Sequence, residues 1–306
     1  MACRFEITLP PEEPGGVAAA RLALDEIDRL EDQLSVYRPA SDVSNLNRTA
    51  SMRPVAVEQR LFDLLQLSQE IFLETEGAFD ITAGPLVRCW GFFQRQGAMP
   101  QAKHLEAARQ RVGLNLVKLD DSDRTVHFLR DGIEINLGSI GKGYALDRAA
   151  EEMRRSRVGA ALLSGGGSSV LALGAPPGTS GWLVGIRHPR RHDARLARVL
   201  LRQGALATSG IGEQNFEFNG KRYGHILDPR SGWPARGIDS VTVVARGAAR
   251  ADALATAFFV GGRDRAERYC AEHSDVLALI LEEKQSKPVL IGKSSFCQVN
   301  LIDESH

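Results

Sequence analysis

The segment of residues 251–262, ADALATAFFVGG, places the strongest constraint on how this chain folds. Asp252 and Thr256 are four residues apart, so on a helix their side chains lie one above the other on the same face. The rest of the segment is apolar enough to be buried, and a buried polar pair needs partners. Either Thr256 bonds back to the carbonyl of Asp252 while Asp252 caps the helix, or both oxygens bind a hard cation such as magnesium.

Two glycine-rich segments lie upstream of this helix. Residues 134–148, EINLGSIGKGYALDR, predict a strand, a glycine turn and a helix start, where Lys142 could meet a phosphate. Their spacing excludes the P-loop of nucleotide triphosphatases. Residues 164–169, SGGGSS, separate strand-like runs at 160–163 and 170–173, so the helix of a dinucleotide fingerprint is missing. We interpret this cluster first as a bend and second as a ligand-facing backbone.

A third segment, residues 223–234, combines a histidine with a rigid corner. A strand-like run ends at Asp228, which Pro229 holds extended, and Gly232 allows a turn. His225 lies just before this corner, where an imidazole could bind a ligand or shuttle a proton. Taken alone, His225 is also compatible with an ordinary surface or core histidine.

Together these segments resemble the FAD:protein FMN transferase family, also called ApbE. The likeness covers nearly the whole chain, in family order: LSVYRPASDVSNLN at 34–47, GAFDITAGPL at 77–86 with WGF at 90–92, the glycine–lysine turn, ALATSG at 205–210, HILDPRSG at 225–232, and the helix with Asp252 and Thr256. The resemblance implies an α+β, T-fold-like enzyme. With magnesium, it would transfer FMN from FAD to a Ser or Thr hydroxyl of an acceptor protein and release AMP.

The resemblance also assigns roles to individual residues. The expected contacts with FAD are Tyr37, Ala78, Phe79, Asp80, Asn136, Lys142, His225 and Ile226. The expected metal ligands are the backbone carbonyl of Ser139 and the side chains of Asp252 and Thr256. His225 and Asp252 are the catalytic candidates, and Asp80 or a metal-bound water is the alternative general base.

Three departures from the family pattern keep other functions open. This chain has Asn136, Ser164 and Ile211 where relatives usually carry Asp, Asn and Asp. Asn136 keeps a hydrogen-bonding group without the charge, whereas the Ile211 side chain cannot form hydrogen bonds. These departures leave open a protein that binds flavin without catalysis. FAD hydrolysis to FMN and AMP is the other alternative, because the same site could use water as the acceptor and the acceptor hydroxyl comes from outside the chain.

The composition limits which classes of partner and which cellular compartment we expect. The 38 basic residues balance the 38 acidic ones, so charge favours neither nucleic acid nor an anionic membrane as a partner. The locally basic stretch at 187–198 predicts a solvated loop, and four widely spaced cysteines indicate neither a metal site nor required disulfides. No run is long enough for a transmembrane helix, and residues 1–9 are typical of a strand. We expect a cytoplasmic protein, with an exported or anchored form lacking its leader as the alternative.

The apolar periodicity predicts an α+β arrangement. A chain of 306 residues with 43% hydrophobic residues is long enough for a single domain over 1–306, which could comprise two closely packed subdomains. Helices are expected at 20–34, 61–72 and 103–112, the last closed by Gly113. Hairpins are expected at 116–129 and at 215–223, around Asn219-Gly220, and later strands at 240–245, 276–281 and 298–302. Strands therefore outnumber helices after residue 158.

Overall fold

The computed structural model describes residues 3–191, 193–212 and 214–302. The described parts of the chain divide into two compact units. Unit 1 comprises residues 1–30, 140–210 and 237–306, and unit 2 comprises residues 31–139 and 211–236. Helix α1 (Gly16–Leu34) begins in unit 1 and ends in unit 2. Each unit therefore combines segments that are distant in the sequence.

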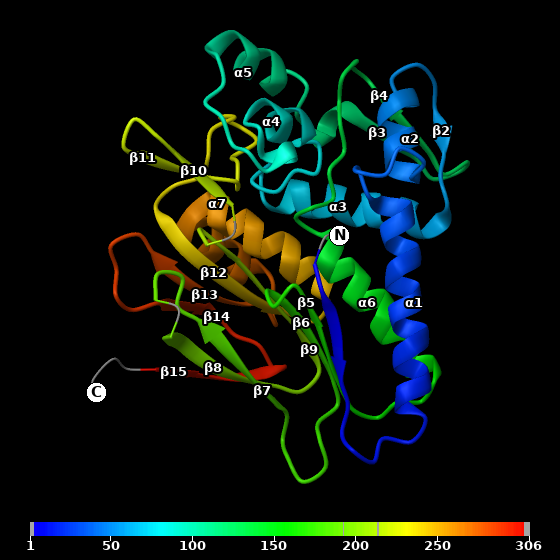
Figure 1. Ribbon diagram of the computed structural model, residues 1–306, viewed down its shortest axis with the longest axis vertical. Coiled ribbons are helices and arrows are strands. Elements are labelled where there is room, and N and C mark those ends of the chain that lie inside the picture. The colour runs from blue at the N-terminus through cyan, green and yellow to red at the C-terminus, as the bar shows by residue number, and fades with distance from the viewer. Residues whose placement is uncertain (1–2, 192, 213, 303–306) are drawn as a thin grey trace. The chain divides into compact units, whose positions relative to one another are not determined.

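Unit 1 is built on a seven-stranded sheet in which all neighbouring strands are antiparallel (Figure 1). In spatial order its strands are β1 (Phe5–Thr8), β5 (Ala161–Gly165), β6 (Ser169–Leu173), β9 (Gly204–Gly210), β12 (Ile238–Ala245), β13 (Leu277–Glu282) and β14 (Val289–Gly292). The predicted strands at 160–163 and 170–173 are confirmed as the neighbours β5 and β6. Those at 240–245 and 276–281 are confirmed as β12 and β13.

Both faces of this sheet are covered. Helices α6 (Gly141–Arg155) and α7 (Ala248–Glu272) lie against one face. A three-stranded sheet of β15 (Cys297–Leu301), β8 (Arg195–Leu201) and β7 (Trp182–Arg187) packs on the other through an apolar layer that includes Val199 and Leu206. Every residue of β12 is consequently buried, including the polar Asp239, Ser240 and Thr242.

The basic stretch at 187–198 differs from the predicted solvated loop. Only its middle connects two strands, because β7 ends at Arg187 and β8 begins at Arg195. The side chains of Arg195 and Arg198 are exposed, whereas those of Leu196, Ala197 and Val199 are buried. A regular strand would place residues 195 and 198 on opposite faces, but the register shift between Arg195 and Ala197 brings both arginines to the exposed side.

Helices α6 and α7 touch closely near their N-termini. A Cβ added at Gly143 would lie 2.0 Å from the carbonyl oxygen of Ala248, so only glycine permits this contact. The carboxylate of Asp147 accepts the amides of Ala248 and Ala249, each at 2.8 Å, and thereby caps α7 from α6. The alternative in which Asp252 caps α7 is wrong, because Asp252 lies inside the helix, which begins at Ala248.

Unit 2 consists of short helices, a three-stranded sheet and a separate hairpin. Its elements are α2 (Asp42–Thr49), α3 (Gln59–Glu74), α4 (Gly84–Cys89), α5 (Ala102–Arg109), the 3₁₀ helices η1 (Phe92–Gln94) and η2 (Leu114–Leu116), the sheet β2 (Val55–Ala56), β4 (Thr125–Phe128) and β3 (Val117–Asp120), and the hairpin β10 (Asn215–Phe218) with β11 (Lys221–Gly224). Both predicted hairpins are confirmed. Asn219 and Gly220 adopt φ of 50° and 70°, as a tight hairpin turn requires.

Two elements of unit 2 are shorter than predicted. Helix α5 stops at Arg109 rather than at residue 112, and a hydrogen-bonded turn leads from there to Gly113. The strand expected after residue 134 is reduced to one parallel bridge between Glu134 and Ala83. Among the described residues, no helix is both long and apolar enough to cross a membrane.

Candidate functional site

The buried carboxylate of Asp252 is the centre of a polar cluster in unit 1. Its side chain is only 5% exposed. Oδ2 accepts the backbone amide of Gly143 at 3.0 Å, and Oδ1 accepts the hydroxyl of Ser169 at 3.3 Å. The ammonium of Lys142 lies 3.6 Å from the same Oδ1. These donors satisfy a charge that would otherwise be expensive to bury.

Thr256 extends this cluster by one helical turn. Its hydroxyl lies 3.4 Å from the carbonyl oxygen of Asp252, so the predicted back-bond exists as a long contact. The hydroxyl of Ser209, on β9, lies 3.2 Å from that of Thr256. Helix α7 therefore presents a carboxylate and a hydroxyl on one face, and strands β6 and β9 add the hydroxyls of Ser169 and Ser209.

The donor set of this cluster fits a magnesium ion. The side chains that could bind a metal, Asp252, Thr256, Ser169 and Ser209, offer oxygen atoms, which a hard cation prefers. Among the described residues, no group of three or more His, Cys, Asp and Glu side chains could hold a metal. A single carboxylate is nevertheless sufficient where substrate phosphates and water complete the coordination, as magnesium sites often require.

Ser139 and Asn136 belong to the segment that leads into α6. Ser139 ends the segment 31–139 of unit 2, and Ile140 begins the segment 140–210 of unit 1. The backbone amide of Asn136 donates to the carbonyl of Ile81 at 2.7 Å, and the side-chain Oδ1 of Asn136 accepts the backbone amide of Gly138 at 2.9 Å. An aspartate could accept that last bond equally well, so the turn does not depend on the missing charge.

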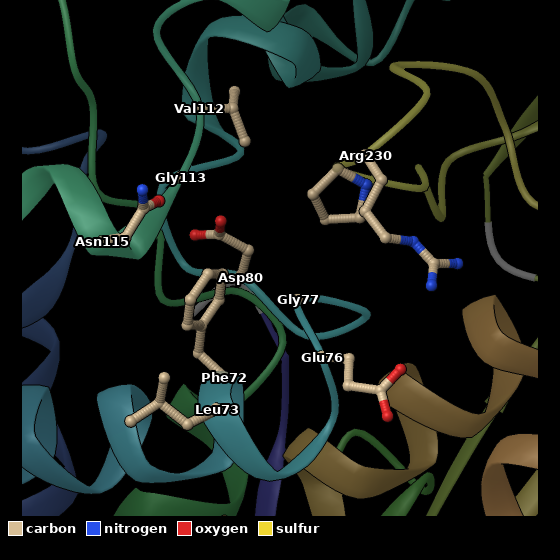
Figure 2. A pocket seen from close by; sticks show the side chains of 10 residues that line it. Phe72, Leu73, Glu76, Gly77, Asp80, Val112, Gly113, Asn115 and Arg230 are labelled. Atoms are coloured by element: carbon tan, nitrogen blue, oxygen red, sulfur yellow. The ribbon is translucent and has the colours of Figure 1, made fainter.

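Asp80 lines a cavity of about 290 Å³ within unit 2. The other lining residues are Phe72, Leu73, Glu76, Gly77, Val112, Gly113, Asn115, Pro229 and Arg230. Figure 2 shows the Asp80 carboxylate pointing toward Gly113 and the start of η2, which carries Asn115, with Arg230 on another side of the cavity. This volume lies at the lower end of the range for small-molecule sites, so it suits one ring or sugar rather than a whole dinucleotide.

The environment of Asp80 raises its pKa to about 6. Burial is the main cause, because desolvation disfavours the charged form. Hydrogen bonds from Thr82 and from the amide of Leu114 oppose this shift without cancelling it. Thr82 in turn accepts the amide of Gly113 at 2.7 Å, which ties Asp80 to the far wall of the cavity. Asp80 therefore titrates close to neutral pH.

The neighbours of Asp80 in the predicted flavin segment are inaccessible through their side chains. Ala78 and Phe79 are 1% and 0% exposed. They can contact a ligand only through the backbone, whereas the Asp80 side chain reaches the cavity.

Tyr37 is 59% exposed and stacks on Phe93 with ring centroids 4.6 Å apart. The guanidinium of Arg88 covers Phe93 at 3.7 Å from the ring centroid. One face of the Tyr37 ring is thus held by Phe93.

His225 and Ile226 lie on the segment that follows β11. The Nδ1 atom of His225 lies 3.2 Å from the carbonyl oxygen of Gln214, and its ring meets Phe92 edge-on at 6.5 Å between centroids. The carbonyl of Ile226 accepts the amide of Ala235 at 2.9 Å. These contacts fix the ring while it remains half-buried.

The structure brings some of the predicted residues together directly. Lys142, Asp252 and Thr256 form one cluster in unit 1, and Asn136 bonds to the backbone beside Asp80 in unit 2. Sequence reasoning missed Ser169, Ser209 and Phe93. Ser169 ends the SGGGSS segment at 164–169, Ser209 lies in ALATSG at 205–210, and Phe93 directly follows the WGF motif.

Solved structures of flavin transferases share the fold of this chain. The crystal structure of the ApbE protein from Thermotoga maritima MSB8 aligns with a TM-score of 0.84 and 31% identity over 96% of this chain and 93% of that chain. The flavin transferase ApbE from Vibrio cholerae aligns with a TM-score of 0.83 and 26% identity over 97% and 95%. The fold is that of the flavin transferases, which confirms the predicted α+β architecture.

Sequence comparison then gives the family. The profile of the ApbE family matches residues 1–281, so the chain belongs to the ApbE family. An FAD:protein FMN transferase of Klebsiella pneumoniae (strain 342) is 32% identical over 270 residues, which cover 88% of this chain and 83% of that protein. The FAD:protein FMN transferase of Escherichia coli (strain K12) is 30% identical over 271 residues, covering 85% and 76%. The predicted family and the prediction of an enzyme are confirmed.

Proposed function

We propose that this chain is a magnesium-dependent FAD:protein FMN transferase, which joins FMN to a Ser or Thr hydroxyl of an acceptor protein and releases AMP. The observation that carries the proposal is the cluster of Asp252, Thr256 and Lys142 in a chain of the ApbE family. It combines oxygen ligands for a hard cation with a flexible cation for a phosphate. Relatives named FAD:protein FMN transferase support the transfer of FMN from FAD to a protein.

The reaction is a phosphoryl-type transfer in which one P–O bond forms and another breaks. The acceptor hydroxyl oxygen forms a bond to the phosphorus of the FMN half of FAD. The bond from that phosphorus to the bridging oxygen breaks, and AMP leaves with the bridging oxygen. The hydroxyl proton passes to a base, for which His225 is our candidate and Asp80 or a bound water the alternative.

The residues of unit 1 have roles that follow from their chemistry. Asp252 and Thr256 would hold magnesium. The carbonyl of Ser139, a residue of unit 2, is the further ligand that the family resemblance indicates. Bound magnesium would neutralise charge that develops on the phosphate oxygens. Lys142 would add a positive charge beside the diphosphate, and the amide of Gly143 keeps the Asp252 carboxylate oriented.

The residues of unit 2 have roles in recognising FAD. The open face of Tyr37 offers a surface on which an aromatic ring of FAD can stack. Asp80, with its pKa near 6, offers a carboxyl group that can accept or donate a hydrogen bond in the cavity. Asn136, Ile226 and the backbone of Ala78 and Phe79 would complete the contacts that the family resemblance assigns.

The experiment that tests this proposal separates the three candidate functions. Purified protein is incubated with FAD and magnesium, with and without a Ser/Thr-containing acceptor peptide. We expect AMP release together with a flavin-labelled peptide, and no AMP after chelation with EDTA. AMP without labelled peptide would support hydrolysis of FAD, and intact FAD in every sample would support a flavin-binding protein without catalysis.

A further inference from the structure

One oxygen of the Asp252 carboxylate faces two donors, and one of these is the ammonium group of Lys142. Oδ1 lies 3.6 Å from the ammonium of Lys142 and 3.3 Å from the hydroxyl of Ser169, while Oδ2 is taken by the amide of Gly143. The Lys142 side chain is 23% exposed, against 5% for Asp252. The lysine therefore reaches solvent from the position where it neutralises the buried carboxylate.

The surroundings explain why Asp252 needs a cation. The residues on either side of it in α7, Ala251 and Ala253, are fully buried, as is Leu254. A carboxylate in such a place is stabilised by a positive charge and hydrogen bonds, and loses stability without them. Ser169 and Gly143 supply neutral donors, so Lys142 is the cation that the structure pairs with this carboxylate.

A divalent ion bound to Asp252 would neutralise the carboxylate in place of Lys142. Magnesium and an ammonium group repel each other, and both would compete for Oδ1. Lysine has a flexible four-carbon stem and a compact charge, so it can turn away if another anion attracts it. The diphosphate of FAD is such an anion.

On the basis of the proposed function, we propose that Lys142 is the resident counter-ion of Asp252 and competes with the divalent metal. The FAD diphosphate draws Lys142 away and thereby raises the affinity of Asp252 for metal. Because coupling between two ligands is reciprocal, metal raises the affinity for the diphosphate by the same factor. Lys142 thus has a positioning role, in addition to contacting phosphate, that makes metal and FAD bind cooperatively.

The test measures metal binding without any turnover. Mn²⁺ is titrated into the full chain at pH 8, and free Mn²⁺ is followed by electron paramagnetic resonance, first without nucleotide and then with ADP as the diphosphate probe. We expect Lys142→Met to bind Mn²⁺ about fivefold more tightly than the parent without nucleotide, since a partly buried ion pair of about 1 kcal/mol is removed from the competition. Lys142→Arg, which keeps the charge, should stay near the parent.

The coupling to the diphosphate is the second readout. ADP should increase the Mn²⁺ affinity of the parent by a larger factor than that of Lys142→Met, after correction for Mn²⁺ bound by ADP in solution. Arg198→Met, on the exposed side of β8, controls for the loss of one positive charge. If Lys142→Met is poorly folded in thermal melts, Lys142→Gln replaces it in the same comparison.

The outcomes distinguish this inference from the proposed function. Mn²⁺ binding by Lys142→Met that is equal to or weaker than that of the parent overturns the competition. Unchanged Mn²⁺ binding by Asp252→Ala would instead show that Asp252 is not a metal ligand, and the metal site of the proposed function would fail first. Tighter Mn²⁺ binding by Lys142→Met together with lost Mn²⁺ binding by Asp252→Ala supports both the competition by Lys142 and the proposed metal site.

Discussion

The backbone amide of Gly143 donates a hydrogen bond of 3.0 Å to Oδ2 of Asp252, across the contact between α6 and α7. This bond is possible because Gly143 has no side chain, and an added Cβ would lie 2.0 Å from the carbonyl oxygen of Ala248. The same glycine thus allows two helices to approach and orients the central carboxylate of the polar cluster. Packing and chemistry are coupled at this residue.

Gly143→Ala should therefore damage both stability and metal binding. Forcing a methyl group against backbone atoms costs about 1–3 kcal/mol or more, which urea denaturation followed by circular dichroism would measure. Gly224→Ala is the matched control, because a Cβ there meets no described atom within 4 Å. Equal stability of both variants would show that α6 and α7 can separate without penalty.

Asp252→Ala should remove most AMP release while FAD binding falls less. The loss of a group that stabilises charge in the transition state costs about 10²–10³-fold in rate, whereas most contacts to FAD remain. AMP release is measured by chromatography and FAD affinity by flavin fluorescence. Asp264→Ala removes an exposed carboxylate from the part of α7 that follows the kink at Gly262 and should leave both unchanged. Metal-dependent turnover at the parental rate in Asp252→Ala would count decisively against the assignment.

Tyr37→Ala should weaken FAD binding. Tyr37 is 59% exposed and braced by Phe93 on one face, so its other face can stack on a ring of FAD. An aromatic pair contributes about 0.5–1.5 kcal/mol beyond area burial, or about 2- to 12-fold in affinity. Tyr37→Phe keeps the ring and should keep the affinity. If fluorescence titration gives the same dissociation constant for Tyr37→Ala and the parent, Tyr37 does not contact the cofactor.

The stability of the protein should depend on pH through Asp80. Its pKa is raised from 3.8 to about 6 by burial, so the folded state holds a proton that the unfolded state has lost. This contribution is fully present below pH 3.8 and is lost as the pH rises through 6. A shift of this size corresponds to about 3 kcal/mol. We therefore expect the stability of the parent relative to Asp80→Asn to fall by up to that amount between pH 4 and pH 7.

Chemical denaturation of both proteins at several pH values in this interval measures the effect. Because Asp80→Asn does not titrate, the difference between the two free energies of unfolding isolates the Asp80 carboxyl from other groups. A difference that stays constant from pH 4 to pH 7 would show that Asp80 is not desolvated in the folded protein.

The sequence was sufficient for features whose signals are local. The spacing of Asp252 and Thr256 predicted a shared helix face, and Asn219-Gly220 predicted a hairpin turn, because both depend on residues at most four apart. Ser169 and Ser209 could not be predicted as partners of this helix. They lie 83 and 47 residues from Asp252 and Thr256, and only the register of β6 and β9 brings them there.

The basic stretch shows a different limit. Its arginines suggested a loop, but the buried residues between them place Arg195 and Arg198 on a strand. Charge dominated the interpretation, and RLARVLL lacks the regular alternation of a half-buried strand, because the pairing of β8 with β7 shifts register beside Arg195. The cavity beside Asp80 could not be predicted from the sequence either, because its walls come from separate segments of unit 2, such as those with Phe72, Gly113 and Arg230.

His225 should contribute to proton transfer rather than to FAD affinity. Its Nδ1 lies 3.2 Å from the carbonyl oxygen of Gln214. When Nδ1–H donates to that oxygen, Nε2 is the nitrogen that carries the lone pair and can accept a proton. A correctly placed general base contributes about 10²–10⁴-fold in rate. His225→Asn should lower turnover at saturating FAD by this order and change the dissociation constant of FAD little.

The dependence of turnover on pH tests this role directly. The parent should lose activity as the pH falls through the range in which histidine is protonated, and His225→Asn should lose this limb of the profile. His104→Asn, at an exposed position of α5, should keep the parental profile. If His225 only packs beside the cofactor, FAD affinity should fall in His225→Asn while turnover at saturating FAD survives. An unaltered profile in that variant would remove His225 from the chemistry and leave Asp80, with its pKa near 6, as the next base to test.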